Sequence, residues 1–332
     1  MARRERTTGL PRPAPRGSKR ATETTRFGLS EHALRLVILG GAAFLLVLVL
    51  GIFAYRWYDD TFQRPNKVVL TVADEQFKLG YYTDRLLPWL QNSRDTSLAV
   101  AQRRLLEKLE EEGLTLVLAR ERGITISDDD ITRAIADELG VPVGGAGSSF
   151  DRLYRQRLQT TGMSDSNYRR LVAAQVADTR IRDQLREEIG TTGETVMLRL
   201  VVVDTEEEAT TVLGRIEAGE DMGSIAQVES THVQSRQQDG LYTTPPVLLT
   251  EEVQEAIVGQ EPGALIGPIE SGGSFWVIRI ERRDPEGTYT EAQIDQLVDL
   301  RFVELLEEAR TRIPIERKLT DDDIRWAEDH LG

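Results

Sequence analysis

The stretch that decides the fold runs from Val196 to Arg283. It opens with the apolar run Val196-Met197-Leu198-Arg199-Leu200-Val201-Val202-Val203 and closes with Phe275-Trp276-Val277-Ile278-Arg279-Ile280-Glu281. Both runs predict strands, and Glu206 to Glu217 between them predicts a helix. A turn sequence, Pro262-Gly263-Ala264-Leu265-Ile266-Gly267-Pro268-Ile269, precedes the second strand. This order predicts a small unit of mixed helix and strand.

The composition around this stretch is that of a globular protein with an uneven charge. At 332 residues, with 40% apolar and 29% charged residues, the chain has room for about two domains. Residues 1–35 carry nine basic and three acidic residues, a net charge of +6, so the remainder carries 32 basic and 52 acidic residues, a net charge of −20. The acidic main part argues against nucleic-acid binding. Residues 1–35 have no apolar period and are predicted to form a disordered tail.

A twenty-residue uncharged segment, Leu36 to Tyr55, follows this basic tail. At about 1.5 Å per residue it spans the roughly 30 Å hydrocarbon core of a bilayer. A cleaved signal peptide is the alternative, but its apolar region is shorter and ends at small residues, whereas this one ends near Trp57 and Tyr58. We therefore expect an uncleaved single-pass anchor in the cell membrane. The positive-inside rule then predicts a cytoplasmic N-terminus and an extracytoplasmic body.

The region after the anchor is predicted to be mainly helical. The predicted elements are an extended segment at 68–73 and helices at about 81–91, 98–122, 128 onward, 150–160 and 164–188. Gly113 within the second helix costs about 1 kcal/mol relative to alanine. Farther along, Thr290 and Gln293 form a capping-box pattern, and the apolar face of the helix that follows needs a packing partner.

Two acidic runs, Asp128-Asp129-Asp130 and Asp321-Asp322-Asp323, mark helix starts and not a metal site. Ser127 and Thr320 precede them as N-caps, and successive helical positions point in different directions. No loop of calcium-binding spacing follows either run. The chain has no cysteine and only three histidines. We predict no disulfide, no metal site and no cofactor.

The stretch from Val196 to Arg283 resembles the parvulin-type peptidyl-prolyl isomerases in the order and spacing of its strands, helix and turns. The helical region resembles the N-terminal chaperone region of the SurA, PrsA and PpiD foldases at two helix-capping junctions, Gly123-Ile124-Thr125-Ile126-Ser127-Asp128-Asp129-Asp130-Ile131 and Gly162-Met163-Ser164-Asp165-Ser166-Asn167-Tyr168-Arg169. This resemblance implies an α+β fold behind the transmembrane helix. Its implied parts are an all-α chaperone domain at 66–190, a parvulin-like domain with an antiparallel sheet at 194–284, and a C-terminal segment, 288–332, that packs on the helical domain.

Parvulin-type isomerases resemble one another in having two histidines on adjacent central strands, a nearby aspartate or cysteine, and an apolar floor. In this chain the histidine positions fall on Leu200 and Trp276, and the acidic or thiol position falls on His232. His232 is then either a solvated loop histidine or a compensating hydrogen-bond donor. The further candidates for a peptide-binding pocket are Asp239, Tyr242, Leu248, Val253 and Phe275.

Together these patterns predict a membrane-anchored extracytoplasmic folding factor that binds unfolded or proline-containing exported polypeptides. Because both histidine positions are replaced, the resemblance implies an isomerase activity that is weak or absent. Two alternatives stay open: an active peptidyl-prolyl cis–trans isomerase, and an envelope scaffold that binds one specific partner. No pattern in the sequence indicates an oligomeric state.

Overall fold

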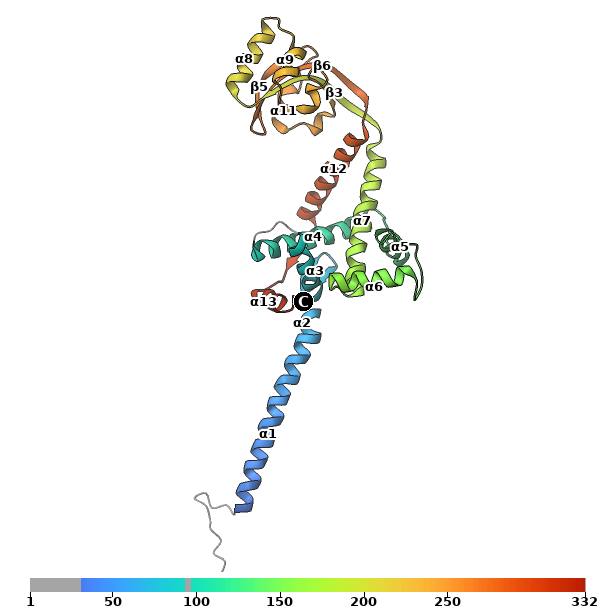
Figure 1. Ribbon diagram of the computed structural model, residues 1–332, viewed down its shortest axis with the longest axis vertical. Helices are drawn as coiled ribbons and strands as arrows, with labels where there is room; N and C mark the ends of the chain where they lie inside the picture. The colour runs from blue at the N-terminus through green and yellow to red at the C-terminus, as the bar shows by residue number, and fades with distance from the viewer. Residues whose placement is uncertain (1–30, 93–96, 332) are drawn as a thin grey trace, which may run out of the picture. The chain divides into compact units, whose positions relative to one another are not determined.

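The computed structural model describes residues 31–92 and 97–331 (Figure 1). It divides into two compact units, Met1–Pro65 and Asn66–Gly332, and each is described by itself. Most of the predicted basic tail, residues 1–30, lies outside the described residues, so its predicted disorder stays a prediction.

The first unit is built on one long apolar helix, α1 (Glu31–Tyr58), which contains the whole predicted span. It continues through a π-helical turn, η1 (Asp59–Gln63), into α2 (Arg64–Asn66). The Phe62 ring lies 5.7 Å from that of Trp57 and 5.8 Å from that of Tyr58. By length and composition α1 is able to cross a membrane.

The helical region of the second unit is assembled from both ends of its chain. Its elements are β1 (Val68–Val72), β2 (Glu75–Lys78), α3 (Leu79–Asn92), α4 (Leu98–Glu121), α5 (Asp128–Glu138), α6 (Ser149–Thr161), α7 (Asp165–Ile189), α12 (Glu291–Arg312), β7 (Ile315–Arg317) and α13 (Asp321–Asp329). One hydrophobic core joins them, and α12 packs against α7 and α4 (Figure 1). The apolar face predicted after Thr290 is buried there through Ile294, Val298 and Phe302.

This region is not all-α, which corrects one part of the expected fold. A three-stranded antiparallel sheet with the order β2-β1-β7 lies within it. β1 was predicted as an extended segment, but β2 and β7 have only four and three residues, too few to show an alternating pattern. β7 is held to α4 by an ion pair between Arg317 and the buried carboxylate of Glu110.

The helix starts follow the predicted capping chemistry. Ser127, Thr290 and Thr320 each accept a hydrogen bond from the backbone N–H three residues later, and the third residue's side chain accepts one from the cap in return. In α13 that residue is Asp323, which also accepts hydrogen bonds from Lys67 Nζ at 2.6 and 2.7 Å. The cap of the last helix therefore also fastens it to the start of the region.

The stretch between these halves forms a second sheet covered by short helices. Its elements are β3 (Thr192–Val203), α8 (Glu206–Glu217), α9 (Met222–Glu229), α10 (Val233–Arg236), β4 (Leu241–Thr244), η2 (Pro246–Leu248), α11 (Glu251–Ile257), β5 (Leu265–Ser271) and β6 (Ser274–Thr288). The sheet is antiparallel with the order β4-β3-β6-β5. The α+β class predicted for the chain is confirmed.

Successive side chains of β3 point to opposite faces of the sheet, and each face has its own hydrophobic core. Leu198 and Leu200 face α11, in a cluster with Val253 and Ile257. Val201 and Val203 face α8 and α9 in a second cluster. Neither cluster shares a residue with the core of the helical region. On that ground we propose that the domain boundaries lie at 190–194 and 284–288.

Candidate functional site

The two histidine positions of the resemblance lie on adjacent strands at one face of the four-stranded sheet. Leu200 on β3 is completely buried, and Trp276 on β6 is half-buried. Trp276 pairs with Val202, whereas Leu200 pairs with Ile278. Both side chains belong to the cluster under α11 that contains Val253. The structure thus brings Leu200, Trp276 and Val253 to one apolar face.

His232 lies beside this face, between two aromatic rings. Its imidazole centroid is 5.1 Å from that of Tyr242 and 5.8 Å from that of Trp276. Nδ1 accepts a hydrogen bond from the Ser235 backbone N–H at 3.3 Å and lies 2.9 Å from Ser235 Oγ, so the ring caps α10. The neutral ring then carries its proton on Nε2. Burial lowers the pKa of His232 below its usual value, which favours this neutral form near pH 7.

Three of the predicted pocket residues do not join this group. Phe275 precedes Trp276 on the same strand, so its side chain points to the opposite face and joins the cluster under α8. The Asp239 carbonyl accepts from Arg199 Nη1 at 2.5 Å, and its carboxylate accepts from the side-chain amide of Gln227 on α9. Leu248, the last residue of η2, is half-buried and does not belong to the apolar cluster, whereas the next residue, Leu249, is buried in it.

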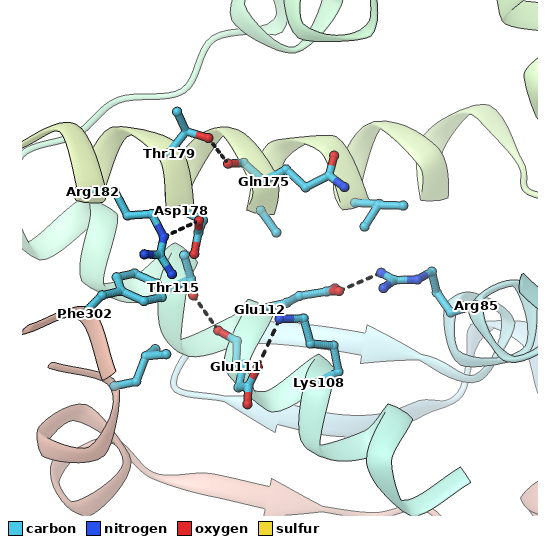
Figure 2. A pocket seen from close by; sticks show the side chains of 13 residues that line it. Arg85, Lys108, Glu111, Glu112, Thr115, Gln175, Asp178, Thr179, Arg182 and Phe302 are labelled. Carbon is cyan, nitrogen blue, oxygen red and sulfur yellow. Dashed lines mark hydrogen bonds and ion pairs between the residues drawn. The ribbon is translucent and has the colours of Figure 1, made fainter. Parts of the chain in front are cut away.

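A separate cavity in the helical region has no counterpart in the sequence-based prediction. It has a volume of about 510 Å³ and lies between α4, α7 and α12, with α3 contributing one wall residue (Figure 2). Its apolar side is formed by Leu171, Ala174, Phe302 and Leu306. Its polar side is formed by Arg85, Lys108, Glu111, Glu112, Thr115, Gln175, Asp178, Thr179 and Arg182.

The charged residues of this cavity are arranged in pairs. Arg85 Nη1 donates to Glu112 Oε1 at 2.7 Å and to the Tyr81 hydroxyl at 2.8 Å, and that hydroxyl donates to Glu112 Oε2 at 2.8 Å. Burial lowers the pKa of Arg85, but the charges of Glu112 and Tyr81 and the hydrogen bonds to both together raise it by more, so the net pKa of Arg85 is raised. Arg182 is bonded to Asp178 at 2.9 Å, and its guanidinium lies 4.3 Å from the Phe302 ring centroid.

A second groove in the helical region is more apolar. It has a volume of about 540 Å³ and lies where the end of α4 meets α5 and α7. Its apolar lining comprises Leu116, Ala119, Ile124, Ile126, Ile131 and Ala173. Glu75 on β2 holds Arg120 and Arg170 at the rim through ion pairs of 2.6 and 2.8 Å. In the part of the chain that the structure describes, no cluster of three or more His, Cys, Asp or Glu side chains could hold a metal ion.

Comparison with known proteins identifies the segment that carries the sheet. Residues 202–282 match the family model described as Rotamase, the PPIC-type PPIASE domain. This segment is a parvulin-type domain. The predicted resemblance is confirmed, although the match begins at Val202 and therefore leaves out Leu200.

Relatives of greater length extend the similarity into the helical region. The chain is 23% identical to chaperone SurA from Yersinia pestis over 291 residues, which cover 75% of this chain and 64% of the relative. It is 24% identical to chaperone SurA from Legionella pneumophila over 272 residues, which cover 71% of this chain and 62% of the relative. The matches thus span less than two thirds of the length of these relatives.

Solved structures of foldases are similar to parts of the chain. Peptidylprolyl isomerase PrsA from Bacillus anthracis aligns with a TM-score of 0.43 at 14% identity, covering 63% of this chain and 96% of that one. The parvulin domain of PpiD from E. coli aligns with a TM-score of 0.26 at 24% identity, covering 29% of this chain and 93% of that one. The expected parvulin-type domain is confirmed by the family model, and the expected similarity to SurA by the relatives.

Proposed function

We propose that this protein is a membrane-anchored, extracytoplasmic folding factor that binds unfolded exported polypeptides. The observation that carries the proposal is the similarity to SurA chaperones, which covers 75% of the chain and is not limited to the parvulin-type domain. Two grooves in the helical region offer concave surfaces with apolar lining. Binding with little sequence selectivity needs such surfaces more than it needs a reactive group.

The anchoring and orientation are part of this proposal. They are supported by the length and hydropathy of α1 and by the excess of basic residues before it. Protease added outside intact cells, or outside spheroplasts where an outer membrane is present, is expected to digest residues 66–332. Full protection of these residues, with digestion only after lysis, would contradict the orientation.

Suppression of aggregation tests the chaperone activity. The full chain in lipid nanodiscs is expected to slow the aggregation of several unrelated, chemically unfolded proteins, because its grooves bind apolar segments that otherwise associate. Light scattering measures the effect, with empty nanodiscs as the control. Failure against all of these proteins would exclude a general chaperone, whereas protection of one protein alone would favour the envelope scaffold.

We further propose that the parvulin-type domain is weak or inactive as an isomerase and binds peptide. A catalyst must lower a barrier of about 18–20 kcal/mol that arises from the partial double bond of the amide. At the two histidine positions, Leu200 has no polar group and Trp276 offers only an indole N–H. His232 supplies an Nε2 proton nearby, and for that reason an active isomerase is retained as the second candidate function.

Exchange NMR of a proline-containing model peptide separates these two candidates. With catalytic amounts of the full chain in nanodiscs, the cis–trans exchange rate is expected to equal the rate with empty nanodiscs. The same peptide is expected to show resonances broadened by binding. Faster exchange that disappears in both His232→Ala and Trp276→Ala would establish the isomerase instead.

A further inference from the structure

The cavity of about 510 Å³ between α4, α7 and α12 is a groove along α7. On each of its walls the lining residues lie at helical spacing. α7 contributes Leu171, Ala174, Gln175, Asp178, Thr179 and Arg182, which share one face of that helix. α12 contributes Phe302 and Leu306, four residues apart, to the apolar side. The groove is therefore a continuous feature of packed helices, and its shape does not depend on a loop.

We propose that this groove binds an extended segment of an unfolded polypeptide that carries a large apolar side chain next to a basic residue. The inference rests on the proposed chaperone function and assigns it a site and a preferred sequence. The volume of about 510 Å³ is within the range of ligand-binding pockets. Leu171, Ala174, Phe302 and Leu306 supply the surface on which the apolar side chain is buried.

Gln175 supplies the group that recognises the peptide backbone. Its side-chain amide makes no hydrogen bond to another described residue, and Figure 2 shows it within the groove. A primary amide has both donors and an acceptor, so it is able to pair with the N–H and C=O of a peptide unit. Such pairing is independent of sequence, as a chaperone site requires.

Two further cavities adjoin this groove along α7, because each shares lining residues with it. Gln175 and Thr179 also line an adjacent cavity of about 560 Å³, and Thr179 and Arg182 line another of about 320 Å³. Together these three cavities follow α7 from Leu171 to Arg186. At about 1.5 Å per residue this path is roughly 23 Å long, enough for about seven residues of extended chain.

The charges along the groove and its two neighbouring cavities indicate which residue is preferred beside the apolar side chain. The groove itself is lined by three carboxylates and three cations, and Lys108 pairs with Glu111. The neighbouring cavities add four carboxylates and two cations: Glu138, Asp183, Asp295, Asp299, Arg180 and Arg186. Asp183 lines both of these cavities and forms no ion pair with another described residue. The excess of carboxylates along α7 favours a basic residue in the bound segment.

Site-specific photo-crosslinking tests the site. A photoreactive residue is placed at Thr179 in the full chain, so that Gln175 is kept. The control position is Thr211 on α8, because both hydroxyls donate to the backbone carbonyl four residues earlier. The probe is a labelled peptide with one leucine and one arginine in a Gly-Ser background. We expect Thr179 to crosslink about tenfold more strongly than Thr211, corresponding to about 1.4 kcal/mol of preference.

Peptide and protein variants separate the two parts of the claim. Replacing the leucine by serine is expected to abolish the crosslink, and replacing the arginine by glutamate to weaken it severalfold. Ala174→Leu, which adds volume to the apolar wall, is expected to reduce the crosslink at Thr179 while the circular dichroism spectrum stays unchanged. Equal crosslinking of the arginine and glutamate peptides would overturn the basic preference.

Failure of this inference is distinguishable from failure of the proposed function. A third photoreactive position, Ile126, lies in the second groove. If the full chain suppresses aggregation but crosslinks only from Ile126, the site is wrong and the chaperone function stands. If crosslinks form at Thr179 without any suppression of aggregation, the groove is confirmed as a peptide site and the general chaperone function fails. No crosslink from any of these positions would overturn the inference.

Discussion

Replacing Glu112 by alanine is expected to lower the free energy of unfolding by about 3–5 kcal/mol. The substitution leaves the guanidinium of Arg85, 10% exposed, without its 2.7 Å carboxylate partner. It also removes the acceptor of the Tyr81 hydroxyl, whose pKa is raised chiefly by burial and then by the charge of Glu112. A buried charge without a partner keeps its desolvation cost and loses its compensation.

Urea unfolding of the full chain in mild detergent, followed by near-ultraviolet circular dichroism, measures this effect. Glu121→Ala is the matched control, because Glu121 forms an exposed ion pair with Arg312 at 2.7 Å and is expected to change stability by less than about 1 kcal/mol. The double variant R85M/E112L is expected to recover most of the loss. Equal effects of Glu112→Ala and Glu121→Ala would show that the buried network does not stabilise the region.

Replacing Gly113 by alanine is expected to destabilise the protein by about 1–3 kcal/mol, although alanine favours a helix by about 1 kcal/mol over glycine. A Cβ at Gly113 would lie 2.8 Å from both Cβ and Cγ2 of Val72 and 3.0 Å from Cε2 of Phe77. The first two atoms belong to a β-branched side chain of β1 and have little freedom to move. The steric cost therefore exceeds the gain in helix propensity.

Gly214 in α8 provides the opposite case within the same chain. A Cβ added there meets nothing within 4 Å, so Gly214→Ala is expected to stabilise the parvulin-type domain by about 1 kcal/mol. Hydrogen exchange of amides in α4 and α8 reports the two regions separately. If both substitutions were stabilising, the contact between α4 and β1 would be looser than the structure shows.

Gly113 also illustrates what the sequence can predict and what it cannot. The cost of this glycine to an isolated helix is visible in the sequence. The reason for a glycine at this position is not, because it is the close contact with Val72, which is distant in the chain and reaches α4 only through the fold. Helix caps such as Ser127 are predicted correctly because the cap and its partner lie three residues apart. An interaction can be predicted from the sequence when its two residues are near each other in the chain, as at a helix cap, but not when the fold brings them together.

The candidate sites show the same limit. Leu200, Trp276 and His232 were identified through the resemblance, and the structure brings Trp276 and His232 within 5.8 Å between ring centroids. Phe275 was assigned to the same pocket, but one step along a strand reverses the direction of a side chain. The groove along α7 was missed because its walls come mainly from three helices. The residues of α4 and α7 read as ordinary polar helix surfaces, and Phe302 and Leu306 of α12 read as part of a buried apolar face.

The small sheet β2-β1-β7 has a consequence for the order of events during synthesis. Its central strand, β1, is made near the start of the second unit, but its neighbour β7 follows the whole parvulin-type domain in the chain. The ion pair of Lys67 with Asp323 likewise joins residues 256 positions apart. Contacts of such separation form late. The parvulin-type domain is an insertion with its own cores and is free to fold first. The helical region also needs α12, which packs on α7 and α4, so its core is completed only after the parvulin-type domain has been synthesised.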